Sequence, residues 1–331
     1  MIYFILAIIA GLALLVWSAD RFVEGSVGMA RNLGMSPMMI GLTVVAFGTS
    51  APEILVSATA AVTGAPDMAV GNALGSNIAN IGLVLGVTAL ISPLPLKRIV
   101  LKREFPVLLI ATLVAYGLLR DQQLDRLDGL IFFALMGLAL FALSRGTEGA
   151  AELIDEVREQ PVRSLSQDIL WFAASLALLI ASSRLLVWGA SGIALELGVS
   201  DLIIGLTIVA IGTSLPELAA CVASALKGHH DVALGNIIGS NLFNLLVVLA
   251  IPALVAPMPL EEEVLIRDYA TMTLLTVTLA LFAYIMWKKG KLARFEGGIL
   301  LAIYLAYTLL IYSAAKYGTS IKALLSTSPF A

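Results

Sequence analysis

Charged residues are scarce in this chain. They make up 13% of its 331 residues, whereas soluble domains usually contain about a quarter. Hydrophobic residues make up 60%, and the mean hydropathy is +0.98. A chain of this composition cannot cover its surface with polar groups, so we expect an integral membrane protein. Its apolar runs are long enough to cross the bilayer as helices, and the short alternating strands of a transmembrane barrel are missing.

Cysteine and histidine are almost absent. The single cysteine, Cys221, excludes an intramolecular disulfide and a thiolate metal cluster, and His229 and His230 are too few for an imidazole metal site. The basic residues are scattered and the net charge is −3, which excludes a nucleic-acid-binding face. The chain also lacks a Walker loop, an HExxH motif and a catalytic histidine within an apolar run. We therefore expect neither an enzyme nor a cofactor.

Apolar runs between charged or Pro/Gly-rich breaks predict an all-α fold with ten membrane-spanning helices. The expected spans are 3–32, 36–63, 67–92, 104–120, 127–144, 167–197, 200–227, 231–256, 268–287 and 294–315. With an external N-terminus, 13 Lys and Arg residues lie in inward connections and five in outward segments. The positive-inside rule favours this orientation, which places both termini outside.

Residues 41–80 and 205–244 are two copies of one segment. Aligned without a gap at an offset of 164, they agree at 20 of 40 positions. Five expected spans separate equivalent points, so the copies enter the membrane from opposite sides. Such inverted repeats place a binding site near the midplane where the halves meet. We therefore divide the chain into a first five-helix half, 1–146, a cytoplasmic linker, 147–166, and an inverted second half, 167–331.

Each copy carries one acid in an apolar span, directly after a proline. A charge at the bilayer centre costs about 2.5–3.5 kcal/mol, and intramembrane acids usually mark ion pathways. Pro52 and Pro216 should break their helices and free backbone carbonyls beside Glu53 and Glu217. Carboxylate, carbonyl and hydroxyl oxygens suit hard cations such as Ca²⁺. A proline kink with purely structural polar groups is the alternative, and it would leave both glutamates unexplained.

Neutral oxygen ligands flank each acid. Hydroxyl groups stand at each break, at Thr49, Ser50, Thr213 and Ser214. In the shared segments GNALGSNIAN and GNIIGSNLFN, a serine and an asparagine four residues apart face the same way on a helix, namely Ser76 with Asn80 and Ser240 with Asn244. The glycines form GxxxG steps that predict close helix packing. Four further asparagines either face the ion or hydrogen-bond the helices: Asn72, Asn77, Asn236 and Asn241. Asp67 and Asp231 are expected as helix N-caps.

The paired motifs GTSAPE with GNALGSN and GTSLPE with GNIIGSN resemble the two alpha-repeats of the calcium/cation antiporter superfamily, and most closely those of bacterial and archaeal sodium/calcium exchangers. The resemblance implies exchange of Ca²⁺ for Na⁺ across the cell membrane of a bacterium or archaeon. It also implies a core of motif-bearing helices, across which two long tilted helices carrying Arg21 and Arg184 slide. The implied Na⁺ or Ca²⁺ ligands are Thr49, Ser50, Glu53, Ser76, Asn80, Thr213, Ser214, Glu217, Ser240 and Asn244, with the carbonyl groups of Ala46 and Ala210.

One departure from the resemblance concerns charge. Some sodium/calcium exchangers carry an aspartate where this chain has Asn244, so the implied site holds only two carboxylates. Two negative charges balance one Ca²⁺, and coupling to H⁺ instead of Na⁺ stays open. A passive channel could use the same oxygens, but an inverted duplication suits alternating access. The expected partners are inorganic cations and the lipid bilayer, with no obligate protein partner and no nucleic acid.

Overall fold

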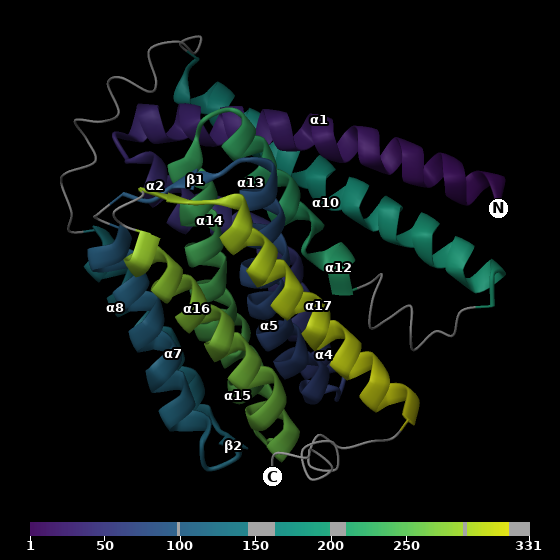
Figure 1. Ribbon diagram of the computed structural model, residues 1–331, viewed down its shortest axis with the longest axis vertical. Helices are drawn as coiled ribbons and strands as arrows, with labels where there is room; N and C mark the ends of the chain where they lie inside the picture. Colours follow the sequence, from purple (N-terminus) through teal and green to yellow (C-terminus); the bar gives the residue numbers. More distant parts are fainter. Residues whose placement is uncertain (98–99, 145–162, 199–209, 287–289, 318–331) are drawn as a thin grey trace.

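The computed structural model describes residues 1–97, 100–144, 163–198, 210–286 and 290–317 (Figure 1). Almost all of the expected linker 147–166 lies outside these residues, as does the start of the second motif, 205–209. The described chain is helical, which confirms the predicted all-α class, and its strands are only two residues long.

The first half begins with a single long helix and continues with shorter, broken ones. Its helices are α1 (Ile2–Leu33), α2 (Pro37–Ile40), η1 (Gly41–Val45), α3 (Ala46–Thr49), α4 (Ala51–Val62), α5 (Pro66–Ala79), η2 (Asn80–Leu85), α6 (Gly86–Ile91), η3 (Val100–Glu104), α7 (Phe105–Leu119) and α8 (Arg126–Ser144). The η segments are π-helical turns within longer helices.

The second half repeats this order. Its described helices are α10 (Leu165–Glu196), α12 (Ala210–Thr213), α13 (Leu215–Leu226), α14 (His230–Phe243), η6 (Asn244–Val248), α15 (Ala250–Val255), η7 (Val264–Tyr269), α16 (Ala270–Met286) and α17 (Arg294–Tyr317). The motif helices α4, α5, α13 and α14 recur at the same offset of 164 that aligns the two sequences.

Seven described helices are long and apolar enough to cross a membrane, and an eighth crossing results if the bent pair Pro37–Thr49 and Ala51–Val62 is one span. Two expected spans fall short of this length for separate reasons. The α7 helix Phe105–Leu119 has only 15 residues after the charged η3 turn. The α13 helix Leu215–Leu226 has 12, and part of its expected span lies outside the described residues.

Two short antiparallel strand pairs connect the halves. Strand β1 (Leu94–Pro95) pairs with β4 (Lys291–Leu292), and β2 (Gln123–Leu124) pairs with β3 (Met258–Pro259). Each pair therefore joins one strand from each half. Strand β1 corresponds to β3 in the other half, and β2 corresponds to β4. A pseudo-twofold axis that relates the halves would therefore superpose one strand pair on the other.

The long helices α1 and α10 lie side by side and cross the direction of the other helices (Figure 1). Their contact is close because glycines remove side chains from it. A Cβ on Gly25 would collide with the backbone of Phe172, and a Cβ on Gly189 would collide with the carbonyl oxygen of Phe4. This arrangement matches the two long tilted helices that the resemblance implies.

The centre of the molecule is formed by the helices that carry the second motif segment. In the apolar windows of α5–α6 and α14–α15, 72% and 83% of residues are buried, against 28% in α1. The predicted close packing of the GxxxG steps is found in α14, where a Cβ on Gly235 or Gly239 would meet the backbone of α2 or η1. It is not found in α5, because a Cβ on Gly71 or Gly75 would meet no atom of another element within 4 Å among the described residues. The segments α5–α6 and α14–α15 are thus largely covered by the rest of the chain.

Candidate functional site

The two segments that carry the motifs GTSAPE and GTSLPE each contain a helix break next to the proline, as predicted. Helix α3 ends at Thr49, Ser50 adopts φ −82° and ψ 2°, and α4 starts at Ala51 with a bend of 44°. In the second half, α12 ends at Thr213 and Ser214 adopts nearly the same angles, φ −88° and ψ 1°. The proline is the second residue of the new helix in each case, where its missing N–H leaves no hydrogen bond unmade.

The two glutamates occupy the first turn of the helices that follow the breaks. Glu53 in α4 and Glu217 in α13 are buried, with 1% and 2% of their surface exposed. Free N–H groups at a helix N-terminus stabilise negative charge. The carboxyl group of Glu217 interacts electrostatically with Glu53 and lies near Thr49 and Ser50 of the other half. The fold therefore places the acidic residues of the two sequence copies near each other.

A hydrogen bond crosses between the halves at the same place. The Thr49 hydroxyl donates to Oδ1 of Asn236, at 3.1 Å, and the Ser240 hydroxyl lies 3.5 Å from the same oxygen. Thr49, Ser240 and Asn236 are all at most 1% exposed. Predicted ligand residues from both copies thus converge on one buried polar region.

Several buried polar atoms in this region have no hydrogen-bond partner among the described residues. They are Oε2 of Glu53, both carboxylate oxygens of Glu217, the Ser50 hydroxyl, Nδ2 of Asn80 and both amide atoms of Asn244. Leaving such groups unpaired costs about 1–3 kcal/mol each, and more when they are charged. Carboxylate, hydroxyl and amide oxygens gathered in this way match the ligands of Na⁺ and Ca²⁺.

Asn80 and Asn244 share a backbone feature that the sequence did not reveal. Each is the first residue of a π-helical turn, η2 or η6, and each is at most 2% exposed. Such turns often occur at functional sites. No pattern of residue types announces a π-helical turn, so only the structure could find this correspondence.

The remaining predicted ligands are positioned as follows. Ala46 and Ser76 are buried, at 0% and 6% exposure, in α3 and α5. Ser214 is buried at the second break, and Thr213 beside it lines a cavity. Ala210 is the first residue of α12. No three histidine, cysteine, aspartate or glutamate side chains gather into a metal cluster within the described residues.

Two of the four asparagines whose role the sequence left open, Asn72 and Asn236, make equivalent contacts in the two halves. Nδ2 of Asn72 donates to the Ser57 hydroxyl at 3.0 Å, and Nδ2 of Asn236 donates to the Cys221 sulfur at 3.3 Å. Ser57 and Cys221 donate in turn to the carbonyl groups of equivalent alanines in α5 and α14. These contacts fasten α4 to α5 and α13 to α14. For Asn72 and Asn236 the hydrogen-bonding alternative is therefore correct.

The predicted N-caps are wrong. The capping positions of α5 and α14 are Ala65 and His229, and neither helix has a side-chain cap. Asp67 and Asp231 lie two residues further in, within the first turn of each helix, and Asp231 forms an ion pair with Lys97 at 2.7 Å. The turn before each helix is set by Gly64 or Gly228, with φ of 84° and 81°, so the first helical residue lies earlier than the acids suggest.

Known proteins resemble this chain along nearly its whole length. The protein CaxA of Alkalimonas amylolytica is 48% identical over 312 residues, which cover 93% of this chain and 98% of that protein. The sodium/calcium exchanger MaX1 of Methanosarcina acetivorans is 30% identical, with 93% and 98% covered. A solved structure of the sodium-calcium exchanger NCX_Mj, soaked without Na⁺ and Ca²⁺, superposes with a TM-score of 0.80 at 34% identity and covers 94% of this chain and 99% of that one.

The sequence pattern of one family spans both halves. The family described as sodium/calcium exchanger protein matches residues 3–145 and 168–313. These two ranges contain both copies of the duplicated motif and every residue of the buried polar region described above. The chain therefore belongs to the sodium/calcium exchanger family.

Proposed function

We propose that this chain exchanges Ca²⁺ for Na⁺ by alternating access to one site near the membrane midplane. One observation supports the proposal above all: buried Glu53 and Glu217, from opposite copies of the repeat, interact with each other and have unpaired carboxylate oxygens among the described residues. Two adjacent buried carboxylates repel each other unless a cation lies between them or a proton neutralises one. A transported cation meets this requirement.

The ligand set we propose is symmetric between the halves. Each half supplies one carboxylate, one threonine, two serines, one asparagine and one backbone carbonyl group. These ligands are Ala46, Thr49, Ser50, Glu53, Ser76 and Asn80, with Ala210, Thr213, Ser214, Glu217, Ser240 and Asn244. Ca²⁺ accepts six to eight oxygen ligands at flexible angles, so a subset of these groups suffices at any moment.

The proposed architecture is two inverted five-helix halves, 1–146 and 167–331, joined by a cytoplasmic linker at 147–166. The recurrence of helix order at one offset and the exchange-symmetric strand pairs support it. The excess of Lys and Arg in alternate connections supports external termini. The membrane we propose is the cell membrane of a bacterium or archaeon. We assign no chemical catalysis, cofactor or obligate protein partner to this transporter.

H⁺ is the alternative coupling ion, and Asn244 is the observation that favours it. With an amide at this position, the site carries at most two negative charges, and several Na⁺ ions would be weakly balanced. The chain would then export Ca²⁺ in exchange for protons taken up by the two glutamates.

The decisive measurement is Ca²⁺ uptake into proteoliposomes of the purified protein. We expect uptake to require an opposing Na⁺ gradient and to persist when the pH gradient is abolished. Uptake driven by a pH gradient alone would replace Na⁺ with H⁺ in the proposal. Uptake that needs neither gradient and follows the membrane potential would identify a channel and overturn exchange.

A further inference from the structure

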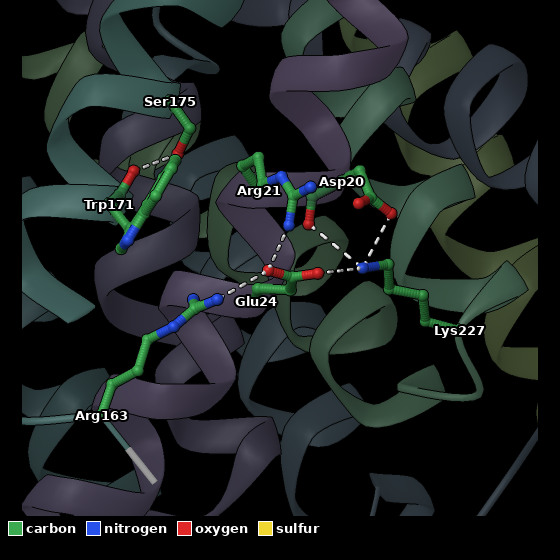
Figure 2. Close-up of polar contacts among 7 residues, drawn as sticks. All are labelled: Asp20, Arg21, Glu24, Arg163, Trp171, Ser175 and Lys227. Atoms are coloured by element: carbon green, nitrogen blue, oxygen red, sulfur yellow. Dashed lines mark hydrogen bonds and ion pairs between the residues drawn. The ribbon is translucent and has the colours of Figure 1, made fainter. Parts of the chain in front are cut away.

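A cluster of five charged side chains ties helix α1 to the end of α13 (Figure 2). The Lys227 ammonium lies 2.7 Å from Oδ1 of Asp20 and 3.1 Å from Oε1 of Glu24. The other oxygen of Glu24 accepts from Arg21 at 3.0 Å and from Arg163 at 3.4 Å. Lys227 is three-quarters buried, and Glu24 is 18% exposed, so water screens the pair less than it screens an ordinary surface ion pair.

The cluster joins two parts of the molecule that the proposed mechanism must move apart. Helices α1 and α10 form one unit, because their glycines bring the backbones together and Nδ2 of Asn32 donates to Asp168 of α10 at 2.7 Å. Lys227 belongs to the other part, because it directly follows the motif helix α13. Sliding of α1 and α10 over the motif helices would therefore break its ion pairs.

The duplication offers an internal comparison. The offset of 164 extends without a gap back to α1, since Gly34 and Gly198, which follow α1 and α10, correspond at this offset and have similar φ angles of 65° and 81°. At that offset Asp20 corresponds to Arg184, Glu24 to Trp188 and Lys227 to Thr63. The charges that hold α1 to α13 therefore have no complementary counterparts between α10 and α4.

The two equivalent interfaces also differ in packing. A cavity of about 250 Å³ lies beside α10, lined by Arg184 and Trp188 and by Val56, Pro52 and Pro216 next to the glutamates. The residue equivalent to Val56 is Ala220, which is 1% exposed and packs in one apolar cluster with Phe22 and Val23 of α1. The structure is thus closed between α1 and α13 and open between α10 and α4.

We propose that Asp20, Glu24 and Lys227 form a latch that holds the exchanger closed between α1 and α13 and thereby favours access to the site beside α10. The inference rests on the proposed alternating access. Interchanging the two halves' conformations would open the α1–α13 interface and close the α10–α4 interface, where the sequence provides no such latch. The two access states are therefore unequal in energy, although the ligands are duplicated. In the proposed orientation the latched face is cytoplasmic.

The relative population of the two access states can be measured with two cysteine reporters at equivalent positions, one at each interface. Single cysteines replace Val56 or Ala220 in a Cys221→Ser background, and the rates of their reaction with a small maleimide are measured on purified protein in lipid nanodiscs. Even an exposed ion pair can shift an equilibrium by up to about fivefold. Lys227→Gln removes two pairs, so we expect the ratio of the Val56→Cys rate to the Ala220→Cys rate to fall about fivefold.

Three further variants separate a latch from general loosening. Lys227→Arg keeps the charge and should restore most of the ratio, and Lys291→Gln, at an exposed lysine in β4, should leave it unchanged. Thr63→Lys with Arg184→Asp installs charges at the unlatched interface and should lower the ratio without touching α1. Asp20→Asn with Glu24→Gln replaces Lys227→Gln if that variant does not fold.

An unchanged ratio in Lys227→Gln and in the Asp20/Glu24 double variant would overturn the latch. An equal fall in Lys291→Gln would do so too, because it would show non-specific loosening. Ca²⁺ flux by the unmodified protein is measured separately. Normal gradient-driven flux with an unchanged ratio would reject the latch alone, whereas absent flux would reject the proposed function.

Discussion

Ser57 in the first half and Cys221 in the second occupy equivalent positions, and each accepts a hydrogen bond from the equivalent asparagine, Asn72 or Asn236. The breaks at Ser50 and Ser214 have backbone angles within a few degrees of each other. Equivalence therefore extends from sequence to individual atoms around the buried glutamates. A site that faces each side of the membrane in turn needs such equal halves.

The periphery of the same two halves is unequal. One interface is fastened by Lys227 and the acids of α1, and the other borders a cavity beside Arg184. In the proposed mechanism, the ligand residues are constrained by an ion that both halves share, whereas residues at the two outer interfaces meet different surroundings. If access alternates as proposed, the residues that bind the ion are duplicated, and the balance between the two access states is set at the outer interfaces.

The largest effect is expected where the halves are most alike. Glu53→Gln and Glu217→Gln should each reduce gradient-driven Ca²⁺ flux by at least about thirtyfold, since losing one partner of a buried charge pair costs about 2–5 kcal/mol. Flux in proteoliposomes is the measurement, with size-exclusion profiles to show that the variants fold. Near-normal flux in one variant only would show that the duplicated acids are not equivalent and would withdraw that residue from the site.

Opposite orientation of the two copies can be tested by sidedness. Cysteines at Ala65, before α5, and at Leu226, the last residue of α13, should react with an impermeant thiol reagent from opposite faces of the membrane. Leu226 is 66% exposed. It is preferred to Gly228 in the following turn, because Gly228 has a φ of 81° that a cysteine adopts poorly.

The background Cys221 is first replaced by serine, and intact and permeabilised cells are compared. We expect Ala65→Cys to react in intact cells at least about ten times faster than Leu226→Cys, because an intact membrane blocks the reagent. Equal reaction of both in intact cells would refute the inverted repeat.

The sequence predicted the parts of this fold that depend on local pattern. Proline after a run of small residues predicted the breaks at Ser50 and Ser214, and charge in an apolar run predicted the buried glutamates. It could not predict contacts between distant residues, because nothing local pairs Lys227 with Asp20, 207 positions away. The ion pairs of Lys227 are therefore visible only in the structure. The N-caps failed because the glycine turns before α5 and α14 determine where the helices start.

The substitution Asn244→Asp tests whether the two halves must carry the same number of acidic side chains. Asn244→Asp gives the second half an extra carboxylate, and two of the three acids then lie in that half. If Na⁺ is the coupling ion, the added charge should stabilise the Na⁺-loaded state and lower the Na⁺ concentration for half-maximal Ca²⁺ flux by about threefold to tenfold, which corresponds to ~1 kcal/mol.

The measurement for Asn244→Asp is Ca²⁺ flux against Na⁺ at fixed pH and against pH without Na⁺. If H⁺ is the coupling ion, the extra acid should instead move the pH profile to higher pH, because neighbouring carboxylates raise one another's proton affinity. Asn80→Asp is the matched variant in the first half. Unchanged curves for Asn244→Asp would mean that residue 244 does not face the ion.

The smallest effect is expected at Cys221, where the two halves already differ. Cys221→Ser copies the first half, so Nδ2 of Asn236 keeps an acceptor and Ca²⁺ flux should stay within about twofold of the unmodified protein. Cys221→Ala removes the acceptor and leaves a buried donor unpaired, which should cost about 1–3 kcal/mol of stability. The Thr49 hydroxyl also donates to Asn236, so a displaced Asn236 would shift a proposed ligand of the other half. The prediction is checked by the thermal midpoint and the Na⁺ dependence of flux in both variants. Equal behaviour of serine and alanine would show that this contact does not position the site.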